Sequence, residues 1–169
     1  MKKLIFLLVN LLFSLPAFAQ NSGNTHDKDV ASIDAIINAY YDVISGSGTD
    51  PWEFERDKFI HSTDAVIIRL DEKGNASYSS LEAEYIPLAL SPREDLFEKE
   101  LGRSVQTYGD IAHVWSAFEI RADPGVPADV RGLNSIRLHF EKGRWFIDSW
   151  TVQMETENDS LVSRFLDDH

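Results

Sequence analysis

Apolar residues recur at three- and four-residue steps over residues 29–44, which is typical of a helix with one buried face. The Ser-Gly-Ser-Gly run at residues 45–48 then predicts the end of this helix. Asp50 and Pro51 follow as an N-cap and a first-turn residue, and they predict a second, shorter helix with Trp52 among its apolar contacts. The chain therefore begins with helices.

Runs rich in Val, Ile and aromatic residues, separated by Gly, Asn and Pro turns, follow the two helices. Residues 80–97 are predicted to be helical in part, with interruptions near Pro87 and Pro92. The pattern predicts strands at residues 65–70, 76–79, 102–108, 111–122, 132–141 and 144–154. Helices followed by a meander of strands predict an α+β fold, with one curved antiparallel sheet packed against the N-terminal helices.

The last two strands can be aligned through a two-residue turn at residues 142–143. This register pairs Phe140 with Trp145 and Leu138 with Ile147 on the core face. Continued to the far end, the same face becomes polar but uncharged, as expected for a cone-shaped pocket; alternatively, these groups bond to one another or lie beyond the core. The candidate pocket lining is Tyr41, Trp52, Ser116, Asn134, Ser149, Thr151 and Gln153.

Two tryptophans are predicted to lie on the outer face of the sheet: Trp150 by this register, and Trp115 on the neighbouring strand, where Val114 and Phe118 face inward. Large apolar side chains on a sheet surface usually indicate that something covers them. Two covers are open at this point: a second copy of the chain, which would make a homodimer through the sheet, or the chain's own C-terminal residues.

Residues 1–19 have the order of a secretory signal peptide: two lysines, an almost unbroken apolar run at residues 4–13, and Ala-Phe-Ala before Gln20. The apolar run is about half of the ~20 residues that a membrane anchor needs. We therefore predict export, to the periplasm or beyond, with cleavage after Ala19. Residues 20–28 are predicted to be a disordered lead-in, and residues 29–169 a single domain.

The chain has a formal net charge of −12, which becomes −14 when the two lysines of the signal peptide are removed. This acidity argues against nucleic acid and anionic membranes as partners, because both would repel the protein. There is no cysteine, so disulfides, thiol catalysis, thiolate metal sites and lipid attachment at the cleavage point are excluded.

No motif in the sequence indicates a metal or a nucleotide cofactor, and the five histidines show no metal-ligand spacing. Acid–base chemistry in an apolar cone would need a buried carboxylate and a hydroxyl donor. Tyr40 or Tyr41 could be the donor, and Asp64 is the nearest acid at the start of a strand. Asp148 and Glu119 are predicted to face outward, which leaves no acid on the inner face of the later strands.

Five segments carry a family resemblance when they are taken in order: YDVISG at residues 41–46, FIHSTDAVI at 59–67, YGDIAHVWS at 108–116, RGLNS at 131–135 and GRWFI at 143–147. Together they resemble the nuclear transport factor 2-like superfamily, which includes SnoaL-like proteins and ketosteroid isomerase. The chain looks most similar to uncharacterised exported bacterial members. The resemblance implies a strongly bent sheet wrapped with helices into a cone (a cystatin-like roll), often dimeric, but it implies no single activity.

The sequence therefore predicts an exported domain that binds a small uncharged or apolar ligand in its cone. Two alternatives stay open. One is a lyase or isomerase that uses a tyrosine donor and an acid. The other is a dimeric structural or protein-interaction module that acts through Trp115 and Trp150.

Overall fold

The structure is a computed structural model that describes residues 24–71, 73–161 and 165. The predicted signal peptide lies outside these residues. The helical elements are η1 (Asp27–Val30), α1 (Ile33–Ile44), α2 (Phe54–Ile60) and α3 (Leu81–Leu90). The strands are β1 (His61–Leu70), β2 (Ala76–Ser80), β3 (Phe97–Tyr108), β4 (Ile111–Arg121), β5 (Val130–Glu141) and β6 (Arg144–Met154).

Helix α1 begins where the side chain of Ser32 caps it, since Ser32 Oγ accepts a hydrogen bond from the backbone N–H of Ala35 at 3.1 Å. Its apolar stripe buries Ile36, Ile37 and Tyr40 against the sheet, as the periodicity predicts. Among the described residues, no helix is long and apolar enough to cross a bilayer.

The first helical element of the described residues, η1, begins at Asp27, two residues before the predicted start of the domain. Two contacts account for this. Val30 is buried in the core, and the carboxylate of Asp29 accepts a hydrogen bond from Arg56 Nε of α2 at 2.8 Å. A buried carboxylate held by a guanidinium fixes this segment against the second helix.

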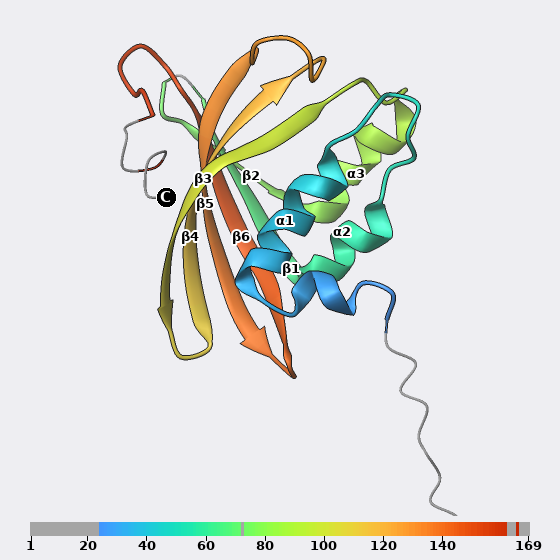
Figure 1. The fold of residues 1–169 in the computed structure, drawn as a ribbon, viewed down its shortest axis with the longest axis vertical. Helices are drawn as coiled ribbons and strands as arrows, with labels where there is room; N and C mark the ends of the chain where they lie inside the picture. Colours follow the sequence, from blue (N-terminus) through green and yellow to red (C-terminus); the bar gives the residue numbers. More distant parts are fainter. Residues whose placement is uncertain (1–23, 72, 162–164, 166–169) are drawn as a thin grey trace, which may run out of the picture.

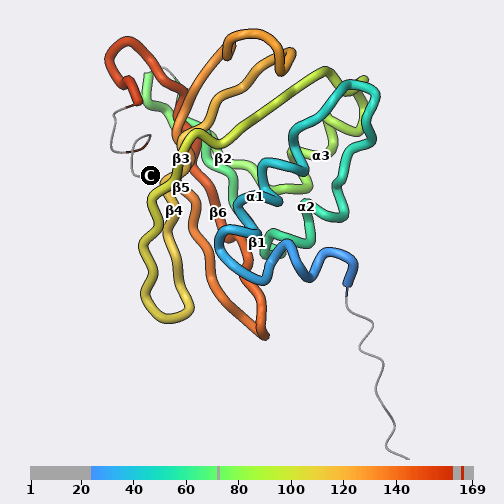
Figure 2. Tube along the Cα trace, in the orientation of Figure 1, coloured from blue at the N-terminus to red at the C-terminus, as the bar shows by residue number. Residues whose placement is uncertain are grey.

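The six strands form one curved, unclosed sheet in the order β2-β1-β6-β5-β4-β3. All the helices lie on one side of this sheet (Figures 1 and 2). The predicted α+β class is confirmed, but the sheet is mixed because β1 runs parallel to β6. Between β1 and β6 the chain passes through β2, α3 and the β3–β5 meander, and a connection of this length allows a parallel pair.

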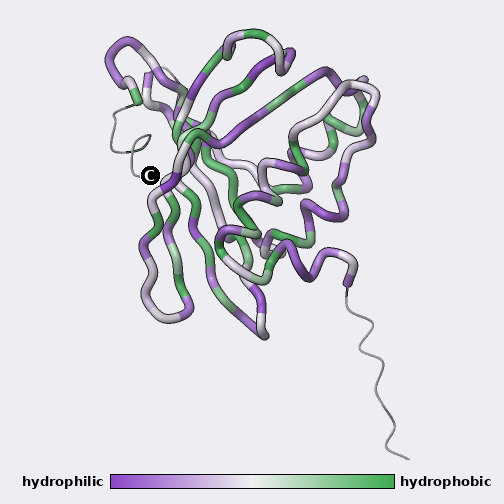
Figure 3. The backbone as a smooth tube through the Cα atoms, viewed as in Figure 1, coloured by the Kyte–Doolittle hydropathy of each residue, from purple (hydrophilic) through white to green (hydrophobic). Residues whose placement is uncertain are grey.

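The core lies between the helices and the inner face of the sheet. Alternate residues of the central strands are buried there, among them Val114, Phe118, Ile136, Leu138 and Ile147, each at most 2% exposed. The alternation of apolar and polar residues is visible along these strands in Figure 3. Each such side chain stabilises the fold by roughly 1.5–3 kcal/mol relative to an exposed position.

The register of the last hairpin is as predicted from its turn up to the pair Leu138–Ile147. There it shifts by one residue: Arg137 lies opposite Ser149, and Asp148 is the extra residue of a β-bulge. The pairing of β1 with β6 shifts at the same place. Both neighbours of β6 thus change register at Asp148, and every residue beyond it faces the side opposite to the prediction.

Trp150 is the main consequence of this bulge. The prediction that it faces outward is wrong, because Trp150 is only 9% exposed and meets the ring of Tyr40 edge-on, with the ring centroids 5.5 Å apart. Thr151 and Gln153 turn outward instead, so their predicted place in the inner cone is also wrong. The free energy gained by burying the indole of Trp150 is larger than the free energy lost where the bulge interrupts the hydrogen bonds between the strands.

Gly132 of β5 leaves no room for a side chain, since an added Cβ would lie 2.6 Å from Cζ of Phe118 and 2.8 Å from the carbonyl oxygen of Gln153. We expect Gly132→Ala to lower the free energy of unfolding by about 1–3 kcal/mol, measured by urea denaturation. Gly125→Ala is the control, because an added Cβ there meets only the side chain of Asp123 at 3.2 Å. Equal midpoints for the two variants would contradict this packing.

Candidate functional site

A cavity of about 170 Å³ lies between α1, α2 and the inner face of the sheet; we call it the inner cavity. Phe118, Ile120 and Val152 contribute to its apolar walls. Its polar groups come from both layers, since Tyr40 and Asp57 belong to helices while Arg69, Glu98 and Asn134 belong to strands. An apolar space with a few converging polar groups is the usual form of a small-molecule site.

Glu98 brings a carboxyl group into the inner cavity, and the prediction that the inner face holds no acid is wrong. Strand β3 begins at Phe97, five residues earlier than predicted, so Glu98 pairs opposite Ile120 of β4. Ser45 fixes this start, because its hydroxyl donates to the backbone carbonyl of Glu98 at 2.8 Å and accepts from the backbone N–H at 3.0 Å. The charged run at residues 98–100 lacks the apolar alternation by which strands are recognised.

Burial raises the pKa of Glu98 to about 7, against the opposing effect of a hydrogen bond with the side chain of Asn134. Near neutral pH the carboxyl group is therefore present in both its protonated and its ionised form. Oδ1 of Asn134 is buried and has no hydrogen-bond partner among the described residues. An unpaired buried acceptor beside an acid that can carry a proton is suited to a polar ligand group.

Tyr40 lies in the same wall and presents a phenolic hydroxyl. Burial, together with the nearby Glu98, raises the pKa of Tyr40 well above its ordinary value, so the hydroxyl keeps its proton. Among the described residues this hydroxyl makes no hydrogen bond. Tyr40 can thus donate to an acceptor on a bound molecule.

Tyr41 and Ser116, both predicted to line the pocket, belong instead to a buried chain of hydrogen bonds. Asn134 Nδ2 donates to the Tyr41 hydroxyl at 3.4 Å, Tyr41 and Ser116 lie 2.6 Å apart, and Ser116 donates to Glu100 at 2.5 Å. Arg103 completes the chain by donating to the other oxygen of Glu100. The hydroxyls of Tyr41 and Ser116 are therefore used within the protein, and Asn134 is the residue of this chain that also lines the inner cavity.

Two further candidates lie away from the inner cavity. Trp52 stacks on Phe54 with the ring centroids 5.8 Å apart, and the guanidinium of Arg93 lies 4.3 Å above it. Ser149 sits at the bulge of β6. Asp64 is exposed on β1, away from the cavity. In the part of the chain that the structure describes, no group of three or more His, Asp or Glu residues could hold a metal ion.

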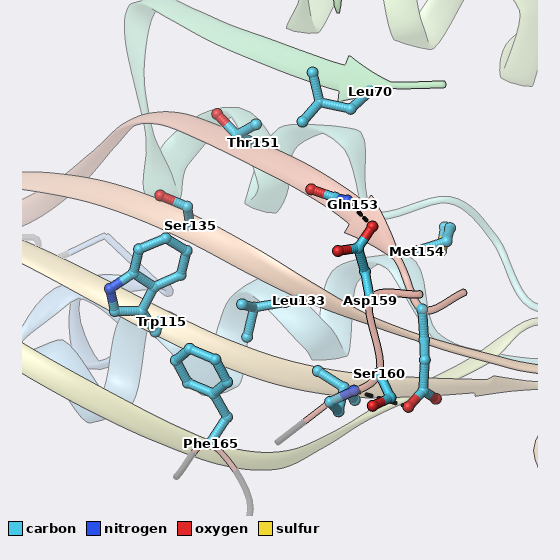
Figure 4. Close-up of a pocket in the computed structure, with 12 residues that line it drawn as sticks. Leu70, Trp115, Leu133, Ser135, Thr151, Gln153, Met154, Asp159, Ser160 and Phe165 are labelled. Atoms are coloured by element: carbon cyan, nitrogen blue, oxygen red, sulfur yellow. Dashed lines mark hydrogen bonds between the residues drawn. The ribbon is translucent and has the colours of Figure 1, made fainter. Parts of the chain in front are cut away.

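Thr151, Gln153 and Trp115 line a second pocket, of about 400 Å³, on the outer face of the sheet. Figure 4 shows them together with Phe165, whose ring centroid is 5.9 Å from that of Trp115. Phe165, near the C-terminus, thus packs on Trp115. This agrees with the prediction that the chain's own C-terminal residues cover the tryptophan. A homodimer through this face stays a prediction.

No protein-family model matches the chain, and no curated protein matches it in sequence. In structure it is similar to an NTF2-like protein of unknown function from Silicibacter pomeroyi, at 20% identity over 74% of this chain and 94% of that one, with a TM-score of 0.52. It is also similar to a protein with a cystatin-like fold from Nostoc punctiforme, at 13% identity over 72% and 90%, with a TM-score of 0.54. A candidate ketosteroid isomerase from Parabacteroides distasonis matches at 12% over 78% and 99%, with a TM-score of 0.54. The nuclear transport factor 2-like fold is thereby confirmed, and at these identities the likeness extends to the fold alone.

The raised pKa of Glu98 has a consequence for stability. Its folded-state value of about 7 exceeds the ordinary 4.5, so the folded protein holds this proton more tightly than the unfolded chain. Stability is therefore lost as pH rises from about 4.5 through about 7. Relative to Glu98→Gln, we expect the native protein to lose about 2 kcal/mol of unfolding free energy between pH 5 and pH 8, measured by urea denaturation.

The matched control is Glu94→Gln, which neutralises an exposed glutamate in the loop before β3. Its stability should follow the native protein at both pH values. Parallel pH dependence of the native protein and Glu98→Gln would show that Glu98 ionises as freely as an exposed side chain.

Proposed function

We propose that this chain is an exported module that binds one small, largely apolar molecule in the inner cavity. The observation that carries the proposal is that Tyr40, Glu98 and Asn134 line the same cavity as a set of apolar side chains, among them Phe118, Ile120 and Val152. The hydroxyl of Tyr40 and Oδ1 of Asn134 have no partner among the described residues. A ligand with one polar group would satisfy them and bury its apolar part against Phe118 and Val152.

The size of the cavity limits the ligand. Drug-sized molecules generally occupy about 300–1,000 Å³. The inner cavity offers about 170 Å³, so it suits a compact molecule of one ring or a short branched chain.

Export is part of the proposal and rests on the sequence of residues 1–19. An exported binding module meets its ligand outside the cytoplasm, where nucleotide cofactors are scarce. The polar groups of the cavity are a phenol, an amide, two carboxyl groups and the guanidinium of Arg69, which is paired with Glu84.

The test is to purify the protein from the periplasm of its native cells, read its N-terminus, and analyse a solvent extract by mass spectrometry. We expect an N-terminus at Gln20 and one small molecule in amounts near one per protein chain. Val152→Phe should lose that molecule, because the larger ring fills the cavity that Val152 lines.

Val105→Phe is the control, since Val105 is 39% exposed on β3 and lies away from the cavity. It should retain the extracted molecule. An empty native protein, or a molecule held equally by Val152→Phe, would exclude this binding function for the inner cavity.

A second candidate function is proton transfer, as in lyases and isomerases, and the pKa of Glu98 favours it. A general base works best when its pKa lies near the working pH, and that of Glu98 is about 7. Tyr40 could donate to the oxygen of an enolising carbonyl while Glu98 removes the neighbouring proton. The candidate ketosteroid isomerase supports this reading only through a shared fold.

This candidate predicts that the protein speeds the exchange of the α-protons of cyclohexanone in D₂O, followed by NMR. The rate should rise with pH through about 7 and then level off, because the ionised carboxylate is the base. Glu98→Gln should slow exchange by about a hundredfold or more, whereas Glu94→Gln should not. Exchange no faster than in buffer would exclude the proton-transfer function, and ligand binding would remain as the proposed function.

A further inference from the structure

Two of the five polar residues that line the inner cavity, Asp57 and Glu98, carry carboxyl groups, and this indicates which ligand the proposed binding function would select. Asp57 enters the wall from α2 and Glu98 from β3, so the helical layer and the sheet each contribute a carboxyl group. The sequence predicted only uncharged polar groups at this place, and hence a small uncharged or apolar ligand. Two carboxyl groups change that expectation.

Asp57 is held in a fixed position by two donors. The hydroxyl of Tyr85, from α3, donates to Asp57 Oδ2 at 2.8 Å. On the other side, Nδ1 of the buried His61 donates to the backbone carbonyl of Asp57 at 2.7 Å and lies 3.2 Å from Oδ1. A carboxylate has about four acceptor sites, so Asp57 keeps capacity for a further donor.

The one cation in the lining, Arg69, is already paired. Both of its terminal nitrogens donate to the carboxylate of Glu84 in α3, each at 2.8 Å. Among the described residues, neither Asp57 nor Glu98 has a Lys or Arg partner in an ion pair. These two carboxyl groups are therefore not matched by a lysine or an arginine of the described residues, and a titratable neighbour of Asp57 is the imidazole of His61.

Aromatic rings complete the surroundings of these acids. Tyr40 and Trp150 lie edge-to-face with centroids 5.5 Å apart, and Phe118 belongs to the same cavity wall. Aromatic faces attract cations through their quadrupole, most strongly where water is excluded. Carboxylates and aromatic rings around a small apolar space suit an ammonium group on a hydrocarbon body.

We infer that the inner cavity selects a small molecule with a protonated amine, whose ammonium lies between Asp57 and Glu98 and whose apolar body packs on Phe118 and Trp150. This inference rests on the proposed binding function and narrows its ligand class. A buried ammonium without partners is strongly disfavoured, so both carboxylates should be needed for tight binding.

The test compares three molecules of similar shape: benzylamine, benzyl alcohol and benzoate. Each is titrated at about pH 8, where a primary amine is still protonated, into ligand-free full-length protein followed by NMR. Benzylamine should bind at least about tenfold more tightly than benzyl alcohol, and benzoate should not bind. Asp57→Asn and Glu98→Gln should each weaken benzylamine about tenfold or more and leave benzyl alcohol within about threefold.

Glu94→Gln is the control for a carboxylate lost outside the cavity, and it should bind all three molecules as the native protein does. If Asp57→Asn does not fold, Glu98→Gln decides the outcome. Equal or tighter binding of benzyl alcohol would overturn the amine inference and leave the proposed binding function standing. If none of the three binds, the inference is overturned, and the extraction from native cells decides separately whether the cavity holds a different molecule.

Discussion

The packing of Trp150 against Tyr40 determines how the inner face of the sheet is arranged. The two rings meet edge-on, with centroids 5.5 Å apart, and they join α1 to β6. Regular alternation after Ile147 would send Trp150 to the outer face. One extra residue, Asp148, reverses the alternation, and it does so where β6 is bonded to β5 on one side and β1 on the other.

The bulge also decides which polar groups face the core. It moves Thr151 and Gln153 to the outer pocket and brings Val152 into the wall of the inner cavity. The polar part of that cavity then depends on the other strands and the helices, from which Glu98, Asn134 and Asp57 come. The register shift thus removes two predicted uncharged groups from the cavity, and the carboxyl groups come from elements that the shift does not affect.

Local patterns predicted the elements well and the site poorly, for physical reasons. The stripe of α1 and the pair Leu138–Ile147 follow from periodicity and turn length, both of which act over a few residues. The bulge could be suspected from the three-residue step between Ile147 and Trp150, since a regular strand would bury positions two apart. Glu98 carries no such signal, because its place in β3 depends on pairing with β4 and on the contact with Ser45.

Glu98 and Glu100 show why one buried acid is structural and another is free to act. They lie two residues apart on the same face of β3. Glu100 is matched by Arg103 and by the hydroxyl of Ser116, so its charge is neutralised and its oxygens are occupied. Glu98 has the amide of Asn134 as its neighbour and no cation, and burial therefore raises its pKa to about 7. A ligand can therefore still change the ionisation of Glu98, because no cation among the described residues is paired with this carboxyl group, whereas Glu100 is already paired with Arg103.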